Sequence, residues 1–207
     1  MRKKPFFVGI SLKLRYCILI FRVQIKKGGK RILITSQHVD LRPAARQDLD
    51  FVLAAEQNEL NCRYIGQWSR EKHTAAITDE DMLHLIVQDK TGQPAGYIII
   101  TGLKDPNQSV NLLRIVINMK GLGYGTAALS LLKDWIFTNT GTHRLWLDVK
   151  EFNSTARHVY EAAGFTTEGI LREAVKHGDS FDSMVIMSIL RQEYKEHAHE
   201  PTQHLNT

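Results

Sequence analysis

Cysteine is scarce in this chain of 207 residues, which contains two, Cys17 and Cys62. They form no motif with each other or with a histidine, so the sequence predicts neither a disulfide framework nor a metal site. The nine histidines are scattered, and those near the C-terminus lie in a polar tail. This cysteine usage fits a reducing compartment, and we expect a cytoplasmic protein.

Acidic residues are missing from residues 1–31, which contain ten lysines and arginines. The rest of the chain therefore has 17 basic and 22 acidic residues, so the net charge of +5 for the whole chain hides a net charge of −5 beyond this arm. The predicted folded part lacks the basic surface that nucleic acid requires. We expect no nucleic-acid partner.

Long hydrophobic runs are also missing. In the N-terminal arm, Lys13, Arg15 and Arg22 break the apolar stretches well below the roughly 18 residues that a membrane span needs. No small-residue cleavage site follows, so a signal peptide is not indicated. Three interpretations of the arm stay open: an irregular or swapped extra strand, an arm on a membrane surface, and upstream sequence included by a wrong start.

The remaining sequence predicts one mixed α/β domain over residues 38–195, between the basic arm of residues 1–37 and a polar tail of residues 196–207. No repeat, low-complexity segment or linker divides it. The predicted order is a strand, two helices, three strands, a helix, a strand, a helix and two strands.

Turn and cap signals set the bounds of these elements. The helices are expected to begin at Asp48, at Ser69, after the glycines near residue 123, and at Asn153. The first of them is predicted to run through residue 60. The strands are expected at residues 38–44, 82–89, 94–103, 110–118 and 143–149, and on both sides of residues 177–180.

Three glycines alternate in the stretch Lys120-Gly121-Leu122-Gly123-Tyr124-Gly125, between a β-branched strand and an amphipathic helix. A glycine-rich turn at a helix start presents free backbone N–H groups at the positive end of the helix dipole, where phosphate binds. The pattern therefore predicts a phosphate-bearing cofactor rather than a plain tight turn.

The spacing of the glycines argues against two common nucleotide folds. A dinucleotide fold requires G-x-G-x-x-G, but Thr126 stands where the third glycine would be, and helices and hairpins precede the motif. Asp148 alone mimics the acid that binds a nicotinamide ribose. The P-loop motif is absent from the sequence.

The glycine stretch resembles the acetyl-CoA motif [Arg/Gln]-x-x-Gly-x-[Gly/Ala] of the GNAT acetyltransferases. A second stretch, with Asn153, Ala156, Tyr160 and Gly164-Phe165, resembles the RimJ/RimL-type branch of that family. Two motifs in the right order and at the right separation are more specific than either one. The resemblance follows the order of elements from about residue 38 to residue 194.

The resemblance implies a single-domain α/β fold with a mixed, mostly antiparallel sheet flanked by helices. The sheet would be splayed between its fourth and fifth strands, at residues 110–117 and 143–149. Acetyl-CoA, as cosubstrate, would lie in the gap with its pyrophosphate on the glycine turn. The cofactor-binding residues implied are Ile115, Val116, Ile117, Lys120, Gly121, Leu122, Gly123, Tyr124, Gly125, Thr126, Asn153 and Ala156.

The resemblance also places the hydroxyl of Tyr160 near the thioester sulfur. The leaving thiolate needs a proton or a hydrogen-bond donor, and a tyrosine hydroxyl can supply it. Tyr160 is therefore the expected catalytic acid, with a core side chain as the alternative. Asn153 is also a natural helix N-cap, and both of its roles are compatible.

Two positions depart from the family pattern. Lys120 replaces the usual Arg or Gln and offers a point charge without a planar fork. Asn111 stands where many relatives carry a glutamate as general base, and asparagine accepts no proton. An alkyl amine with a pKa near 10.4 is deprotonated in roughly one molecule per thousand at pH 7.4, a handicap of about 4 kcal/mol, whereas an α-amine loses only a fraction of that.

An enzyme without a strong base is thus better suited to an α-amine, or it uses another carboxylate. Glu56, Glu59 and Glu71 are candidates on the helices expected to border the acceptor site, and a solvated helix face is the alternative for each. Trp68 either forms a wall of that site or is a buried anchor.

The sequence therefore predicts an N-acetyltransferase that transfers acetyl from acetyl-CoA to a primary amine by direct attack in a ternary complex. No cysteine lies near the motifs to serve as a nucleophile. A protein N-terminal α-amine is favoured as acceptor over a polyamine or another small amine. A non-catalytic CoA-binding module is the rival from another class. The expected partners are CoA and the amine, and the sequence allows a homodimer.

Overall fold

The computed structural model describes residues 33–194. The predictions for residues 1–31 and for the polar tail from residue 196 lie outside this range. Among the described residues, no helix is both long and apolar enough to cross a membrane. In the same range, no group of three or more histidine, cysteine or acidic side chains is placed to hold a metal ion.

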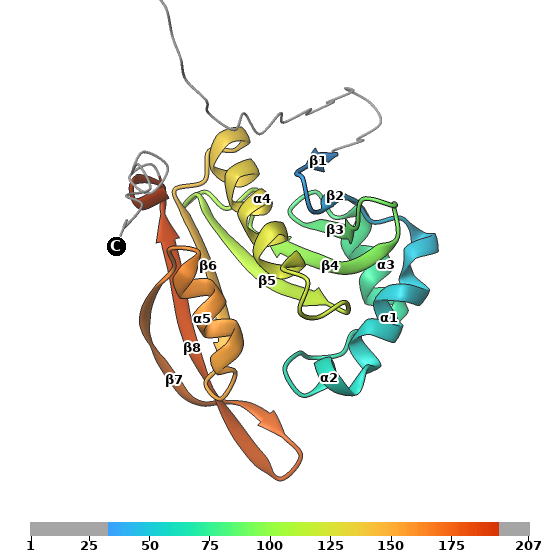
Figure 1. Cartoon of the computed structure of the whole chain (residues 1–207). Coiled ribbons are helices and arrows are strands. Elements are labelled where there is room, and N and C mark those ends of the chain that lie inside the picture. The colour runs from blue at the N-terminus through green and yellow to red at the C-terminus, as the bar shows by residue number, and fades with distance from the viewer. Residues whose placement is uncertain (1–32, 195–207) are drawn as a thin grey trace, which may run out of the picture.

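An eight-stranded sheet forms the centre of the described domain (Figure 1). The strands lie side by side in the order β1-β2-β3-β4-β5-β6-β8-β7, and every neighbouring pair is antiparallel except β5 and β6. The strand bounds are β1 Ile34–Thr35, β2 Asp40–Pro43, β3 Leu83–Gln88, β4 Pro94–Thr101, β5 Ser109–Ile117, β6 Arg144–Lys150, β7 Thr166–His177 and β8 Ser180–Leu190.

Helices cover both faces of the sheet. On one face, α4 buries Leu129, Leu132 and Ile136 in the larger core, where α5 also packs. On the other face, α1 buries Val52 and Ala55 in a second core that α3 completes. The helix bounds are η1 Arg46–Asp48, α1 Leu49–Gln57, α2 Glu59–Cys62, α3 Arg70–Thr78, α4 Tyr124–Asn139 and α5 Ser154–Ala162.

The parallel pair β5–β6 separates along its length. The two strands are paired at three positions, the last of which joins Asn111 to Trp146. β5 nevertheless continues to Ile117 alongside β4, and β6 continues to Lys150 alongside β8. The predicted fold, with a mostly antiparallel sheet splayed between these two strands, is confirmed.

Two elements differ from the predicted bounds. The expected helix through residue 60 breaks at Asn58, whose extended backbone ends α1 and whose side chain accepts the N–H of Leu60 to cap α2. β1 lies within the predicted arm, and Ile34 is fully buried, so the sheet begins before the expected boundary at residue 38. A strand of two residues is too short to produce a recognisable period.

Candidate active site

The glycine turn between β5 and α4 adopts a backbone that L-residues avoid. Gly121 has a φ of 77° and Gly123 a φ of 72°, both in the left-handed region. A Cβ built at either glycine would meet no protein atom within 4 Å. The turn therefore faces open space, and its glycines serve the backbone shape and close approach rather than internal packing.

The N-terminus of α4 is free to bind an anion. Gly123 is its N-cap, and no side chain of the described residues caps this end. The first backbone bond of the helix runs from the N–H of Ala127 to the carbonyl of Gly123, at 3.0 Å. The N–H groups before Ala127 thus point out of the helix, as a diphosphate site requires. This region fits the phosphate end of acetyl-CoA.

Lys120 connects the turn to α2. Its Nζ donates to the side-chain oxygen of Asn61 at 2.8 Å, and burial lowers the pKa of this lysine. Asn61 in turn donates to the carbonyl of Ala55 and to the side chain of Asn118, each at 2.9 Å. The predicted phosphate-binding lysine is therefore held beside the turn by a buried asparagine that the sequence analysis did not single out.

β5 carries a bulge beside the split. Ile99 of β4 pairs with Arg114 and Ile100 pairs with Leu112, which leaves Leu113 without a partner in β4. Bulges disrupt a ladder locally and re-aim side chains, and they are frequent next to active sites. The predicted pantetheine contacts, Ile115 to Ile117, follow directly, on the part of β5 that has no β6 partner.

The start of α5 lies beyond the end of β6. The side chain of Asn153 accepts the N–H of Ala156 at 3.2 Å, so the predicted N-cap is confirmed. Further along the helix, Tyr160 is half-buried, and its ring lies 5.9 Å from that of Phe165. Its hydroxyl forms no hydrogen bond with the described residues. Burial, and then the negative charge of Asp148, raises the pKa of Tyr160.

Asp148 is a candidate that the sequence analysis placed only in the nicotinamide alternative. It lies on β6, two residues beyond the last position paired with β5. No lysine or arginine in residues 33–194 forms an ion pair with it. Asp148 is exposed on β6, but partial desolvation of its carboxyl group by neighbouring atoms raises its pKa. The sequence could have indicated Asp148 as a site residue, because it lies near the end of a predicted strand that leads into the Asn153–Tyr160 motif.

Glu56 is not on a solvated helix face, and that interpretation is wrong. The side chain is fully buried, and its carboxylate accepts the hydroxyl of Tyr97 and the N–H of Trp68, each at 2.8 Å, and the guanidinium of Arg114. Burial alone would raise the pKa of Glu56, but hydrogen bonds from His73 and Trp68 and the charge of Arg114 outweigh it and lower the pKa. Glu56 is thus the centre of a buried polar network.

The other acceptor-site candidates differ in their exposure. Trp68 is half-buried against the second core, with the guanidinium carbon of Arg114 at 4.9 Å from its ring centroid, which supports the anchor interpretation. Glu59 and Glu71 are exposed in the first turns of α2 and α3. Neither lines the pocket described next.

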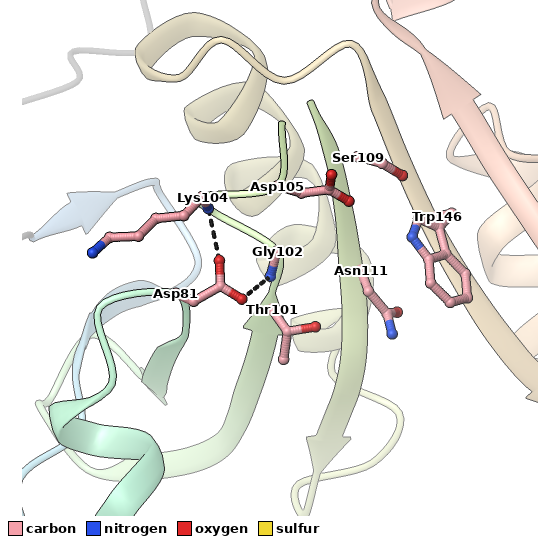
Figure 2. A pocket seen from close by; sticks show the side chains of 8 residues that line it. All are labelled: Asp81, Thr101, Gly102, Lys104, Asp105, Ser109, Asn111 and Trp146. Atoms are coloured by element: carbon pink, nitrogen blue, oxygen red, sulfur yellow. Dashed lines mark hydrogen bonds between the residues drawn. The ribbon is translucent and has the colours of Figure 1, made fainter. Parts of the chain in front are cut away.

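A pocket of about 470 Å³ opens where β5 and β6 are still paired (Figure 2). Asn111, the residue at the predicted base position, lies in it, and its buried Oδ1 has no hydrogen-bond partner among the described residues. The lining comes from β4, β5 and β6, from the turn between β4 and β5, and from the segment between α3 and β3, which supplies Asp81. The lining residues are Asp81, Thr101, Gly102, Lys104, Asp105, Ser109, Asn111 and Trp146.

A parallel strand pair that splits beside a bulge, followed by a left-handed glycine turn and an uncapped helix, defines the class of the acetyl-CoA-dependent N-acetyltransferases. Residues 38–166 match the family model described as the acetyltransferase (GNAT) domain. The chain belongs to this family, and acetyl-CoA is its cosubstrate.

Several relatives act on polyamines by name. Spermidine N(1)-acetyltransferase of Escherichia coli K12 is 26% identical over 171 residues, covering 77% of this chain and 90% of the relative. The enzyme of the same name from Vibrio cholerae is 24% identical and covers 77% of this chain and 96% of its own length. An uncharacterised N-acetyltransferase of Methanocaldococcus jannaschii is 25% identical, with coverages of 70% and 89%.

Solved structures share the fold. The Vibrio cholerae spermidine N-acetyltransferase in complex with CoA and spermine has a TM-score of 0.71 at 24% identity, and covers 77% of this chain and 99% of that one. The relatives with a named activity are spermidine acetyltransferases, so the expected placement in the RimJ/RimL-type branch is not what the comparisons indicate.

Proposed function

We propose that this enzyme acetylates a primary amine of a polyamine or a similar alkyl amine. The observation that carries the proposal is the similarity to two spermidine N(1)-acetyltransferases. The match covers 90% of the length of one and 96% of the length of the other. It favours the small-amine alternative over the protein N-terminus that the sequence analysis preferred.

Acetyl-CoA supplies an acetyl group activated as a thioester, and we assign its binding to the predicted residues. The outward N–H groups from Leu122 to Thr126 hold the pyrophosphate, and Lys120 lies beside them to neutralise charge. The unpaired part of β5, Ile115 to Ile117, offers backbone groups to the pantetheine arm. Asn153 orients that arm from the start of α5.

An alkyl amine acceptor requires a base, because it is almost wholly protonated at neutral pH. Asn111 cannot serve, and Glu56 is fully occupied in its buried network. We assign the base to Asp148, which no cation in the described residues neutralises and whose raised pKa makes it a better proton acceptor than an ordinary aspartate. Tyr160 donates a proton to the leaving thiolate.

The proposal is tested by following release of free thiol from acetyl-CoA with spermidine, spermine, butylamine and a panel of peptides with free N-termini. We expect kcat/KM for the polyamines to exceed that for every peptide by at least about tenfold. Faster turnover of a peptide would overturn the proposal. Tight CoA binding without turnover of any amine would favour the non-catalytic module.

A further inference from the structure

The pocket in Figure 2 lies on the same face of the sheet as the buried Glu56 network. Thr101, Asn111 and Trp146 occupy one row across β4, β5 and β6, because Asn111 is paired with both of the others. Ser109, at the start of β5, and Asp105, in the turn between β4 and β5, lie above this row. Three strands therefore fix the floor of the pocket, and a hydrogen-bonded turn fixes its upper rim.

The charge of this pocket is negative. Asp81 accepts the backbone N–H groups of Gly102 at 3.1 Å and Lys104 at 2.7 Å, and Asp105 accepts that of Asn107 at 2.8 Å. These donors are neutral backbone groups. The ammonium group of Lys104 is paired with Glu80 and points away from the other lining residues in Figure 2.

Two further groups suit a cation. A buried oxygen without a donor costs about 1–3 kcal/mol, and the Oδ1 of Asn111 is such an oxygen within the described structure. An ammonium group carries the donors that would satisfy it. The half-buried indole of Trp146 offers an aromatic ring to a cation or to methylene groups. The lining therefore matches an alkylammonium ion better than an anion or a neutral apolar ligand.

The pocket is also correctly placed along β6. Trp146 and Asp148 are two residues apart on one strand, so their side chains lie on the same face about 7 Å apart. This is the order of the separation between neighbouring nitrogens in an alkyl polyamine. An acceptor whose terminal amine lies beside Asp148 would thus bring its next nitrogen to the row of Trp146 and Asn111.

We propose that the pocket lined by Asp81, Asp105, Asn111 and Trp146 binds a second ammonium group of the acceptor and selects polyamines over monoamines. The inference rests on the proposed function, since it takes the reacting amine to lie beside Asp148. The pocket would be a subsite that recognises the positive charge next to the reacting nitrogen. Selection follows because a monoamine brings no second ammonium group to the two carboxylates and no donor to the Asn111 oxygen.

The cleanest variant is Asp105→Asn. The amide oxygen of asparagine can still accept the N–H of Asn107, so the turn is retained while the charge is removed. Asp81→Asn is less suitable, because both of its oxygens accept backbone N–H groups. A matched control exists in Asp89→Asn in the β3–β4 turn, whose Oδ1 accepts the N–H groups of Thr91 and Gln93 at 2.9 Å each.

Spermidine and butylamine are the two probes, and both turnover and binding are measured. We expect Asp105→Asn to raise the KM for spermidine about fivefold to tenfold and to reduce the preference for spermidine over butylamine by a similar factor. Asp89→Asn should leave this preference unchanged. Asn111→Ala, which removes the unpartnered oxygen, should reduce it in the same direction as Asp105→Asn.

Calorimetric titration of spermidine into the CoA-bound enzyme separates the two proposals. Binding weakened about fivefold to tenfold by Asp105→Asn, and not by Asp89→Asn, supports the pocket even if turnover is slow. If the wild-type enzyme acetylates spermidine but Asp105→Asn and Asn111→Ala both leave its KM within about twofold, the pocket proposal is overturned and the proposed function stands. If spermidine binds the wild type no better than butylamine does, the pocket proposal also fails.

Discussion

In the proposed mechanism, Asp148 and Tyr160 divide the proton transfers of the reaction between two side chains, one on β6 and one on α5. Their environments favour that division. Partial desolvation raises the pKa of the exposed Asp148 carboxyl, and burial together with the charge of Asp148 raises the pKa of the Tyr160 hydroxyl. The first is thereby a better proton acceptor, and the second stays protonated at neutral pH until a thiolate forms beside it.

Asp148→Asn tests the base. We expect kcat/KM for spermidine at pH 7.5 to fall about 100-fold, and then to rise about tenfold per pH unit as the free amine becomes available towards pH 10. A pH–rate profile of wild type and variant measures this. Glu151→Gln, exposed at the end of β6, is the control and should retain the wild-type profile. A profile of Asp148→Asn parallel to the wild type would rule out the assignment.

Tyr160→Phe tests the acid. The ring and its contact with Phe165 are retained, and the hydroxyl has no hydrogen-bond partner in the described residues, so the free energy of unfolding should be unchanged. At saturating acetyl-CoA and amine we expect kcat to fall about 100-fold. Single-turnover kinetics and urea denaturation check the two halves of this prediction. An unchanged kcat would make Tyr160 a core residue only.

At the scale of elements, the glycine turn was the part that the sequence predicted best. Left-handed glycines before a helix produce a recognisable local pattern, and the structure has them at Gly121 and Gly123. The break between α1 and α2 was missed, because the apolar spacing runs past Asn58 while its side chain caps a new helix. Local competition between a helix and a cap is difficult to resolve from spacing alone.

Gly123→Ala tests the turn. A left-handed backbone costs an L-residue about 1–2 kcal/mol, and the new methyl group points to open space where the phosphate is expected. We expect that loss in the free energy of unfolding, and a rise of about tenfold in the dissociation constant for CoA. Gly92→Ala is the control: its φ of 86° imposes the same strain in the β3–β4 turn, and a Cβ there also meets open space. Equal CoA affinity in the two variants would contradict the assignment.

At the scale of the whole molecule, a buried polar network lies between the sheet and the helices α1 and α3, on the face of the second core. His73 Nδ1 lies 3.2 Å from His84 Nε2, and both imidazoles are buried. Burial, and then the charge of His73, lowers the pKa of His84 to about 4. As the pH falls, the unfolded chain therefore binds a proton at this histidine near pH 6.5, whereas the native protein binds it only near pH 4.

Stability should consequently fall as pH decreases from 6.5 towards 4, because the unfolded state holds more protons in that window. His84 alone contributes a loss of about 2 kcal/mol in the free energy of unfolding between pH 7 and pH 5. Urea denaturation of wild type and His84→Gln measures the difference, with the exposed His158→Gln as control. Parallel pH dependence in wild type and His84→Gln would contradict this prediction.

The sequence by itself determined most of the order of elements and the glycine turn, because both depend on local periodicity, cap residues or backbone freedom. The splayed sheet was expected only from the family resemblance. Only the tertiary structure decided that Glu56 is buried against Arg114, that Asp148 lies near Tyr160, and that Asn111 and Trp146 share a pocket with two aspartates. Those relations join residues far apart in the chain. They follow from strand register and from the point where β5 and β6 separate, which no local pattern encodes.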